Sequence, residues 1–161
     1  MRIISGKYKN RELKSPNSNA THPMSERARL SIFNMLGDVT GKSALDLFAG
    51  TGALGLETLS RGATSCIFVE NHGKTLQILK ENLQGIENAT VLKSDVYKLD
   101  LNEKFDLIFI DPPYDQFDVK ILDFKKLLTN DGIMVVSSPE PISENSRKYA
   151  NCYITLWRAG R

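Results

Sequence analysis

The sequence is poor in cysteine and has no long hydrophobic run. Its 161 residues include two cysteines, Cys66 and Cys152, each inside a short apolar stretch. Two isolated cysteines make neither a disulfide framework nor a thiolate metal site, so we expect reduced core thiols, a cytoplasmic protein and no metal. The apolar runs fall well short of the roughly 20 residues that cross a bilayer, and the charged opening Met1 to Gly6 does not resemble a signal peptide. Secreted disulfide scaffolds and membrane-spanning proteins are therefore excluded.

Charge is distributed unevenly along a chain that is otherwise ordinary, 41% hydrophobic and 25% charged. Residues 1–42 hold eight Lys and Arg against three Asp and Glu, whereas residues 43–161 hold thirteen against sixteen. A basic N-terminal segment on a mildly acidic body indicates a polyanion partner, although a solvated basic hairpin without a partner would show the same pattern. We expect a basic arm over 1–21, a main domain over 22–161, and a monomer.

The order of predicted elements indicates an α/β fold. Residues 2–5 and 11–14 favour two strands of a small N-terminal β-hairpin, and Ser25 is a candidate N-cap for a helix that runs to Leu36. From Ser43 onwards, short apolar runs alternate with helical segments, which predicts a mostly parallel sheet flanked by helices. The expected strands are 44–48, 66–70, 90–93, 105–111, 133–137 and 153–157, and the expected helices are 53–61, 74–83 and 119–128.

A glycine-rich turn follows the first strand of this sheet. Gly50, Gly52 and Gly55 form the pattern G-x-G-x-x-G between a strand and a helix, and Glu70 follows twenty residues after Gly50. Glycine lets a backbone turn sharply and approach a ligand closely, and an acid at the end of the second strand can accept from both ribose hydroxyls. The same glycines could serve packing alone. In this context the pattern predicts a nucleotide cofactor.

Asp46 indicates which nucleotide cofactor the protein binds. A carboxylate four residues before Gly50 would repel a pyrophosphate but could hold a ligand ammonium group, which favours S-adenosylmethionine over a nicotinamide cofactor. Asp95, after the third strand, could accept from the adenine amine, and the Val96 N–H could donate to a ring nitrogen. The predicted cofactor site comprises Asp46, Phe48, Ala49, Gly50, Gly52, Glu70, Asn71, Asp95 and Val96.

The fourth strand ends in Asp111-Pro112-Pro113-Tyr114, which we predict to be catalytic. An exocyclic base amine is a poor nucleophile because its lone pair is delocalised into the ring. The Asp111 carboxylate and the Pro112 carbonyl can both accept from such an NH₂ group and favour its pyramidal form. Tyr114 can stack on a base that has been splayed or flipped out of its helix. A rigid solvent-facing turn is the alternative for this motif.

These motifs together resemble the RsmD-type bacterial 16S rRNA guanine-N2 methyltransferases. The resemblance rests on residues 46–57, on 111–114, on the opening residues 1–8, and on 22–29, 33–36 and 59–63. It implies a Rossmann-like class I methyltransferase fold. It also implies methyl transfer from S-adenosylmethionine to N2 of one guanine, of the position-966 type, in free 16S rRNA or the 30S particle.

Two positions depart from the family pattern. His22-Pro23-Met24 stands where the family usually has Arg-Pro-Thr, and Ser137-Ser138 stands where it commonly carries a glutamate. The predicted RNA contacts are Arg2, Lys7, Lys9, Arg11, His22, Arg27 and Arg29. Two alternatives stay open: methylation of another planar amine, in DNA or a protein glutamine, and a nucleotide-binding protein without catalysis that uses NAD.

Overall fold

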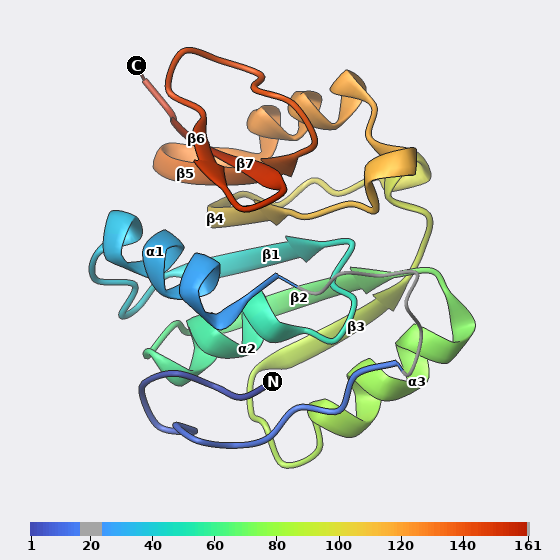
Figure 1. The fold of residues 1–161 in the computed structure, drawn as a ribbon. Coiled ribbons are helices and arrows are strands. Elements are labelled where there is room, and N and C mark those ends of the chain that lie inside the picture. Colours follow the sequence, from blue (N-terminus) through green and yellow to red (C-terminus); the bar gives the residue numbers. More distant parts are fainter. Residues whose placement is uncertain (17–23, 161) are drawn as a thin grey trace.

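A seven-stranded sheet forms the centre of the molecule (Figure 1). The computed structural model describes residues 1–16 and 24–160. The strand order is β3-β2-β1-β4-β5-β7-β6, and β7 alone runs opposite to the other strands, antiparallel to both β5 and β6. The elements are α1 (Glu26–Leu36), β1 (Ser43–Leu47), α2 (Ala53–Ser60), β2 (Ser65–Glu70), α3 (Gly73–Asn82), β3 (Ala89–Lys93), η1 (Val96–Lys98), β4 (Phe105–Ile110), η2 (Tyr114–Gln116), η3 (Val119–Leu127), β5 (Leu128–Ser138), β6 (Arg147–Tyr149) and β7 (Cys152–Arg158). The predicted α/β fold with a mostly parallel sheet is confirmed.

The strand order reverses between β1 and β4. Leu47 on β1 lies opposite Val69 on β2 and opposite Ile110 on β4. The three strands therefore end at the same level, and the residues that follow them emerge side by side. In open α/β sheets ligands bind in the crevice outside the carboxyl ends of the strands at such a reversal. This edge of the sheet is where a site is expected.

Two apolar layers hold the sheet in place. One face packs against α1, α2, α3 and the N-terminal segment through residues such as Phe33 and Leu79. The other face packs against η1 and η3 through residues such as Val96 and Ile121. The central strands are apolar along most of their length because both of their faces are covered. None of the helices in the described part of the chain is long and apolar enough to cross a lipid bilayer.

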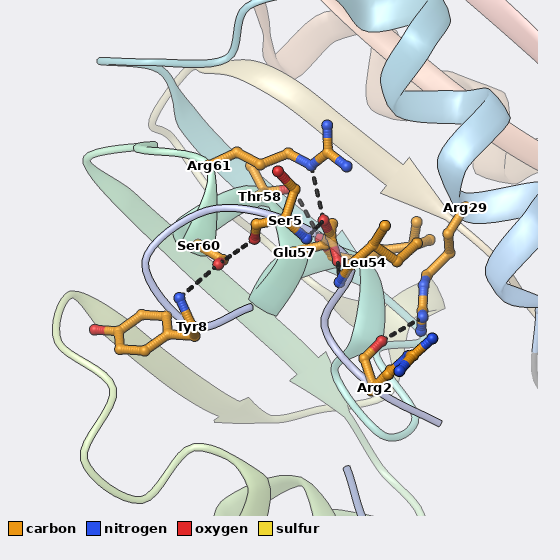
Figure 2. Close-up of polar contacts among 10 residues, drawn as sticks. Arg2, Ser5, Tyr8, Arg29, Leu54, Glu57, Thr58, Ser60 and Arg61 are labelled. Carbon is orange, nitrogen blue, oxygen red and sulfur yellow. Dashed lines mark hydrogen bonds and ion pairs between the residues drawn. The ribbon is translucent and has the colours of Figure 1, made fainter. Parts of the chain in front are cut away.

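The N-terminal segment is fastened to α2 by hydrogen bonds (Figure 2). The backbone N–H groups of Ile4 and Ser5 donate to the carboxylate of Glu57 at 2.7 and 3.0 Å. Glu57 is fully buried, and these bonds together with an ion pair to Arg61 Nε at 2.8 Å satisfy its charge inside the protein. The Ser60 hydroxyl accepts from the Tyr8 N–H at 2.9 Å. A Cβ on Gly6 would lie 1.8 Å from the Ser60 carbonyl oxygen, so only glycine fits there.

The same segment is also fastened to α3. The Arg11 guanidinium donates to the carbonyl oxygens of Asn82 and Gln84, at the carboxyl end of the helix, where cations are favoured. The Asn82 side chain accepts from the Lys14 N–H at 2.8 Å and donates to the carbonyl of Thr51 at 2.9 Å. The arm is thus a packed part of the body. The predicted boundary between 1–21 and 22–161 falls outside the described residues and stays a prediction.

Three elements differ from their prediction. The hairpin arm reverses as expected, but its two halves pair through one antiparallel bridge, Arg2 with Glu12, instead of two strands. The helix expected over 119–128 is a 3₁₀ helix over Val119–Leu127. The strand β6 was not predicted, because Arg147–Tyr149 is short and polar. Ser25 does cap α1, with its hydroxyl accepting from the Ala28 N–H at 3.1 Å.

Candidate active site

The glycine turn after β1 has the backbone that its sequence predicts. Phe48, Gly50 and Gly52 all have positive φ angles, of 58°, 58° and 81°. A Cβ on Gly50 would have only the Phe48 carbonyl oxygen nearby, at 3.8 Å, so the space above Gly50 is open. A Cβ on Gly55 would lie 2.3 Å from the Phe68 ring, so this third glycine serves helix–sheet packing. Only the first part of the turn offers a surface to a ligand.

Glu70 at the end of β2 holds this turn. One carboxylate oxygen accepts from the Gly50 N–H at 2.9 Å, and the other accepts from the N–H groups of Asn71 and His72 at 2.9 and 2.8 Å. A carboxylate has about four lone-pair positions, so one stays free. A bidentate contact with a ribose would require one of these backbone bonds to open. The predicted role of Glu70 stays a prediction, and the structure adds that Glu70 shapes the turn.

Asp46 lies beneath the turn and is almost completely buried, with 2% of its surface exposed. Burial raises the pKa of its carboxyl well above the ordinary value, the N–H of Gly55 opposes this by donating at 2.9 Å, and the charges of Asp111 and Glu70 raise it further. The carboxyl groups of Asp111 and Glu70 are therefore close enough to Asp46 to repel its charge. These three carboxyl groups form an acidic edge of the sheet, where β1, β2 and β4 end side by side.

A cavity of about 830 Å³ opens near the acidic edge, between η1 and the segments η2 and η3. Asn71, Asp95 and Val96 line it, as does Tyr97, whose ring meets the Phe48 ring edge-on with centroids 5.9 Å apart. The Asp95 carboxylate accepts from the Tyr97 N–H at 3.0 Å and so begins η1. Phe48, Asn71, Asp95 and Val96, four of the predicted cofactor residues, are thus gathered on this side.

A second cavity, of about 540 Å³, opens on the β4–β5 side and contains Asp111 and Tyr114. Burial raises the pKa of the Asp111 carboxyl to about 6. Burial together with the neighbouring Cys152 thiol raises the pKa of Tyr114 to about 12, so its phenol is neutral at physiological pH. The residue as a whole is 38% exposed. Arg27 on α1 also lines this cavity. The predicted catalytic residues Asp111 and Tyr114 therefore face an open space beside the acidic edge.

The residues at these strand ends are compatible with S-adenosylmethionine. Asp46, Glu70 and Asp95 lie at or after the ends of β1, β2 and β3, and carboxylates suit an ammonium group, ribose hydroxyls and an adenine amine better than they suit phosphates. The open space above Gly50 and the cavity beside Asp95 give room for a ligand. The fold is that of a class I methyltransferase, and these residues fit its cofactor.

Comparison with known proteins gives the family. A family model described as "Conserved hypothetical protein 95" matches residues 1–155. The chain is 39% identical over 163 residues to "Putative rRNA methyltransferase YlbH" of Bacillus subtilis, with 89% of each chain covered. It is 38% identical over 120 residues to "Ribosomal RNA small subunit methyltransferase D" of Escherichia coli K12, with 71% of this chain and 60% of the relative covered. The chain belongs to this family, the RsmD-type methyltransferases.

A solved structure confirms the fold. "Putative methyltransferase yhhF from Escherichia coli" superposes with a TM-score of 0.83 at 27% identity, covering 99% of this chain and 97% of that one. The resemblance found in the sequence and the Rossmann-like class I fold are thereby confirmed. Membership of this methyltransferase family supports S-adenosylmethionine as the cofactor.

One predicted RNA contact is wrong. Arg29 is fully buried, its guanidinium donates to the Arg2 carbonyl at 2.7 Å, and burial lowers its pKa (Figure 2). It lies on the same face of α1 as Ile32 and Phe33, so it cannot reach RNA. Arg29 precedes the apolar residues Ile32 and Phe33 by three and four positions, and this helical spacing could have indicated from the sequence that Arg29 lies on the buried face of α1.

The other predicted RNA contacts lie at different places. The Arg11 guanidinium already donates hydrogen bonds to carbonyl groups at the end of α3. Arg2, Lys7, Lys9 and Arg27 are exposed, and His22 lies outside the described residues. The structure also brings Ser137 and Lys148 to the cavity of Asp111, and no role at this site was predicted for either.

Proposed function

We propose that this protein transfers a methyl group from S-adenosylmethionine to the exocyclic N2 of a guanine in 16S rRNA. The observation that carries the proposal is the position of Asp111 and Tyr114, which line one cavity at the end of β4, beside the carboxylates of the acidic edge. Relatives named as small-subunit rRNA methyltransferases support RNA as the substrate.

When bound, S-adenosylmethionine supplies a methyl group on a sulfonium, which is already electrophilic. The chain's own residues then act on the acceptor. Asp111, ionised above its pKa of about 6, accepts a hydrogen bond from one N–H of the amine and receives its proton once the nitrogen has bonded to the methyl group. The Pro112 carbonyl accepts from the second N–H, which keeps the lone pair turned toward the methyl group.

Tyr114 positions the base. The residue is 38% exposed at the cavity, and stacking of a base on such a ring contributes about 1–3 kcal/mol. Most of the rate comes from holding the amine and the methyl group in line, because proximity and orientation replace a collision in solution. Asp46, Gly50, Glu70 and Asp95 hold the cofactor in this proposal, with their neighbours Phe48, Ala49, Gly52, Asn71 and Val96.

The test offers the enzyme radiolabelled S-adenosylmethionine with 30S particles, naked 16S rRNA, DNA or protein. We expect label in 16S rRNA, at N2 of one guanine after digestion and nucleoside mapping. Label confined to DNA or to protein glutamine would contradict the proposal in favour of another planar amine. Calorimetry with S-adenosylhomocysteine and with NAD provides the cofactor control, since tight binding of NAD alone would exclude methyl transfer.

The exposed cations of the arm form part of the proposed RNA surface. Lys7 forms an exposed ion pair with Glu87 at 3.2 Å, and Lys9 and Arg2 are exposed nearby in the sequence. Each phosphate contact to single-stranded nucleic acid contributes about −0.7 to the slope of log affinity against log salt. Replacing Lys7 and Lys9 by Ala should therefore make that negative slope shallower for 16S rRNA, and an unchanged slope would remove the arm from the RNA surface.

A further inference from the structure

The short 3₁₀ helix η2 contributes residues to both of the cavities described above. Tyr114, its first residue, lines the cavity of about 540 Å³ together with Asp111. Asp115 and Gln116, the next two residues, line the cavity of about 830 Å³ together with Asp95. One turn of backbone therefore connects the wall of the proposed acceptor site with the wall of the proposed cofactor site.

The backbone of this turn has few hydrogen bonds. The Gln116 N–H donates to the Pro113 carbonyl at 2.9 Å. The Phe117 N–H donates to the Tyr114 carbonyl at 3.4 Å, so both of these bonds lie within the turn itself. Among the described residues, the one hydrogen-bond partner that this backbone has in another element is the Tyr97 hydroxyl, which donates to the Gln116 carbonyl. Because hydrogen bonds within a 3₁₀ turn have poor geometry, an outside donor helps to fix its position.

Tyr97 itself is attached to residues on the cofactor side. It lies on η1, which follows β3, and its N–H donates to the Asp95 carboxylate at 3.0 Å. Its ring meets the ring of Phe48 edge-on, with the centroids 5.9 Å apart, and Phe48 directly follows β1. Tyr97 therefore contacts two of the residues predicted to hold the cofactor and reaches η2 with its hydroxyl.

The hydrogen bond from Tyr97 to Gln116 is open to water. Tyr97 is 42% exposed and lines the larger cavity. Partial burial raises the pKa of its phenol, and the charges of Asp118 and Asp95 add to the rise, against the backbone N–H of Asp118. The phenol is therefore neutral and able to donate at physiological pH. A hydrogen bond becomes stronger when water is excluded, so a ligand in this cavity would strengthen the bond to Gln116.

We propose that Tyr97 is a positioning residue that couples the cofactor site to the acceptor site. A cofactor in the larger cavity shields the hydrogen bond from Tyr97 to Gln116, and the strengthened bond holds η2 so that Tyr114 stays in place for the acceptor. Such coupling is reciprocal, so the bound acceptor strengthens cofactor binding by the same factor. This inference rests on the proposed function, because it takes the two cavities to hold the cofactor and the acceptor.

The first test measures the affinity for 16S rRNA with and without saturating S-adenosylhomocysteine. In the wild type we expect S-adenosylhomocysteine to strengthen RNA binding about fivefold or more. In Tyr97→Phe, which removes the hydroxyl and keeps the ring, this factor should be about threefold smaller, the value of one hydrogen bond. The affinity for S-adenosylhomocysteine without RNA should fall by less, because the ring still meets Phe48. An equal factor in both proteins, or no strengthening in the wild type, would overturn the inference.

Tyr153→Phe is the matched control for the loss of a tyrosine hydroxyl. Tyr153 lies on β7 and does not line either cavity, so this variant should keep the wild-type coupling. In turnover with saturating S-adenosylmethionine, Tyr97→Phe should raise KM for RNA about threefold, whereas Tyr153→Phe should leave it unchanged. Equal losses of coupling in the two variants would contradict the role of Tyr97.

Hydrogen exchange without RNA separates this inference from the proposed function. S-adenosylhomocysteine should slow exchange at the amides of Gln116 and Phe117 in the wild type, and it should slow them less in Tyr97→Phe. If rRNA is methylated but exchange and coupling in Tyr97→Phe match the wild type, the inference alone fails. If exchange responds as described but rRNA is not methylated, the proposed function alone fails.

Discussion

Asp46 lies near the end of β1 and Asp111 directly follows β4, the parallel strand beside it, and the charge of Asp111 contributes to the raised pKa of Asp46. Asp46 lies beneath the glycine turn, and Asp111 begins the Pro-Pro-Tyr corner. Because β1 and β4 are neighbouring parallel strands, the turn and the corner leave the sheet at the same edge. A cofactor held by one and an acceptor held by the other would meet there.

Replacing Asp111 by Asn should lower kcat by about 10²–10³-fold, the loss typical of one preorganised polar group at a reacting centre. The affinity for S-adenosylhomocysteine, measured by calorimetry, should change little, because Asp111 acts on the acceptor amine. Asp131→Asn, which changes an exposed acid on β5 that lines neither cavity, is the matched control. Equal activity of the two variants would remove Asp111 from the mechanism.

The pH dependence of methyl transfer should report Asp111. Its pKa is raised to about 6, and the protonated carboxyl cannot receive the proton of the amine. We therefore expect kcat to fall about tenfold per pH unit below pH 6 and to level off above it. The measurement is kcat against pH, with S-adenosylmethionine and RNA saturating. A profile that is flat from pH 5 to 8 would contradict this role.

Ionisation of the Asp111 carboxyl, which should raise kcat, should lower the free energy of unfolding. Because its pKa is about 6 in the folded protein, against 3.8 for an unperturbed aspartate, the folded state binds the proton more tightly than the unfolded chain. Its contribution to the free energy of unfolding therefore falls as pH rises from about 4 to about 6. At pH 7, Asp111→Asn should be more stable than the wild type by about 1–3 kcal/mol in urea unfolding. At pH 3 the difference should vanish.

Gly6→Ala should destabilise the protein through a direct clash. The new Cβ would lie 1.8 Å from the Ser60 carbonyl oxygen, at a residue whose φ is +85°. Gly37→Ala separates the two causes, since Gly37 has φ +75° but no atom within 4 Å of such a Cβ. We expect a loss of about 1 kcal/mol for Gly37→Ala and about 1–3 kcal/mol more for Gly6→Ala, measured by urea unfolding. Equal losses would mean that the arm shifts freely.

Glu57→Ala should detach the arm. It leaves the N–H groups of Ile4 and Ser5 without their acceptor, at a cost of about 1–3 kcal/mol for each buried group. Hydrogen exchange at these two amides should become fast. Glu81→Ala, which removes an exposed ion pair with Lys14, should cost less than about 1 kcal/mol. Unchanged exchange in Glu57→Ala would show that other contacts hold the arm.

The strands that carry the site were predictable because their burial on both faces leaves an apolar run that ends at a polar residue. Asp111 after β4 and Glu70 at the end of β2 follow directly from that pattern. The 3₁₀ form of η3 was overlooked, although Ile121, Phe124 and Leu127 repeat every three residues, the period of such a helix.

Contacts between residues that are far apart in the chain could not be predicted from the sequence. Net charge alone did not distinguish Arg29, which holds the arm from inside, from Arg27, which lines the cavity. The sequence did not predict the ion pairs of Lys7 with Glu87 and of Lys14 with Glu81 either. Nor did it predict that Lys148 lines the cavity of Asp111. Such contacts depend on how the chain folds back on itself.

The fastening of the arm to α2 and α3 has a consequence for biosynthesis. Ile4 and Ser5 find their acceptor 53 and 52 residues later, and Lys14 finds its partner Asn82 68 residues later. A nascent chain emerging from the ribosome exposes its first residues long before those partners exist. Within residues 1–161, the segment that is synthesised first is therefore among the last to become ordered.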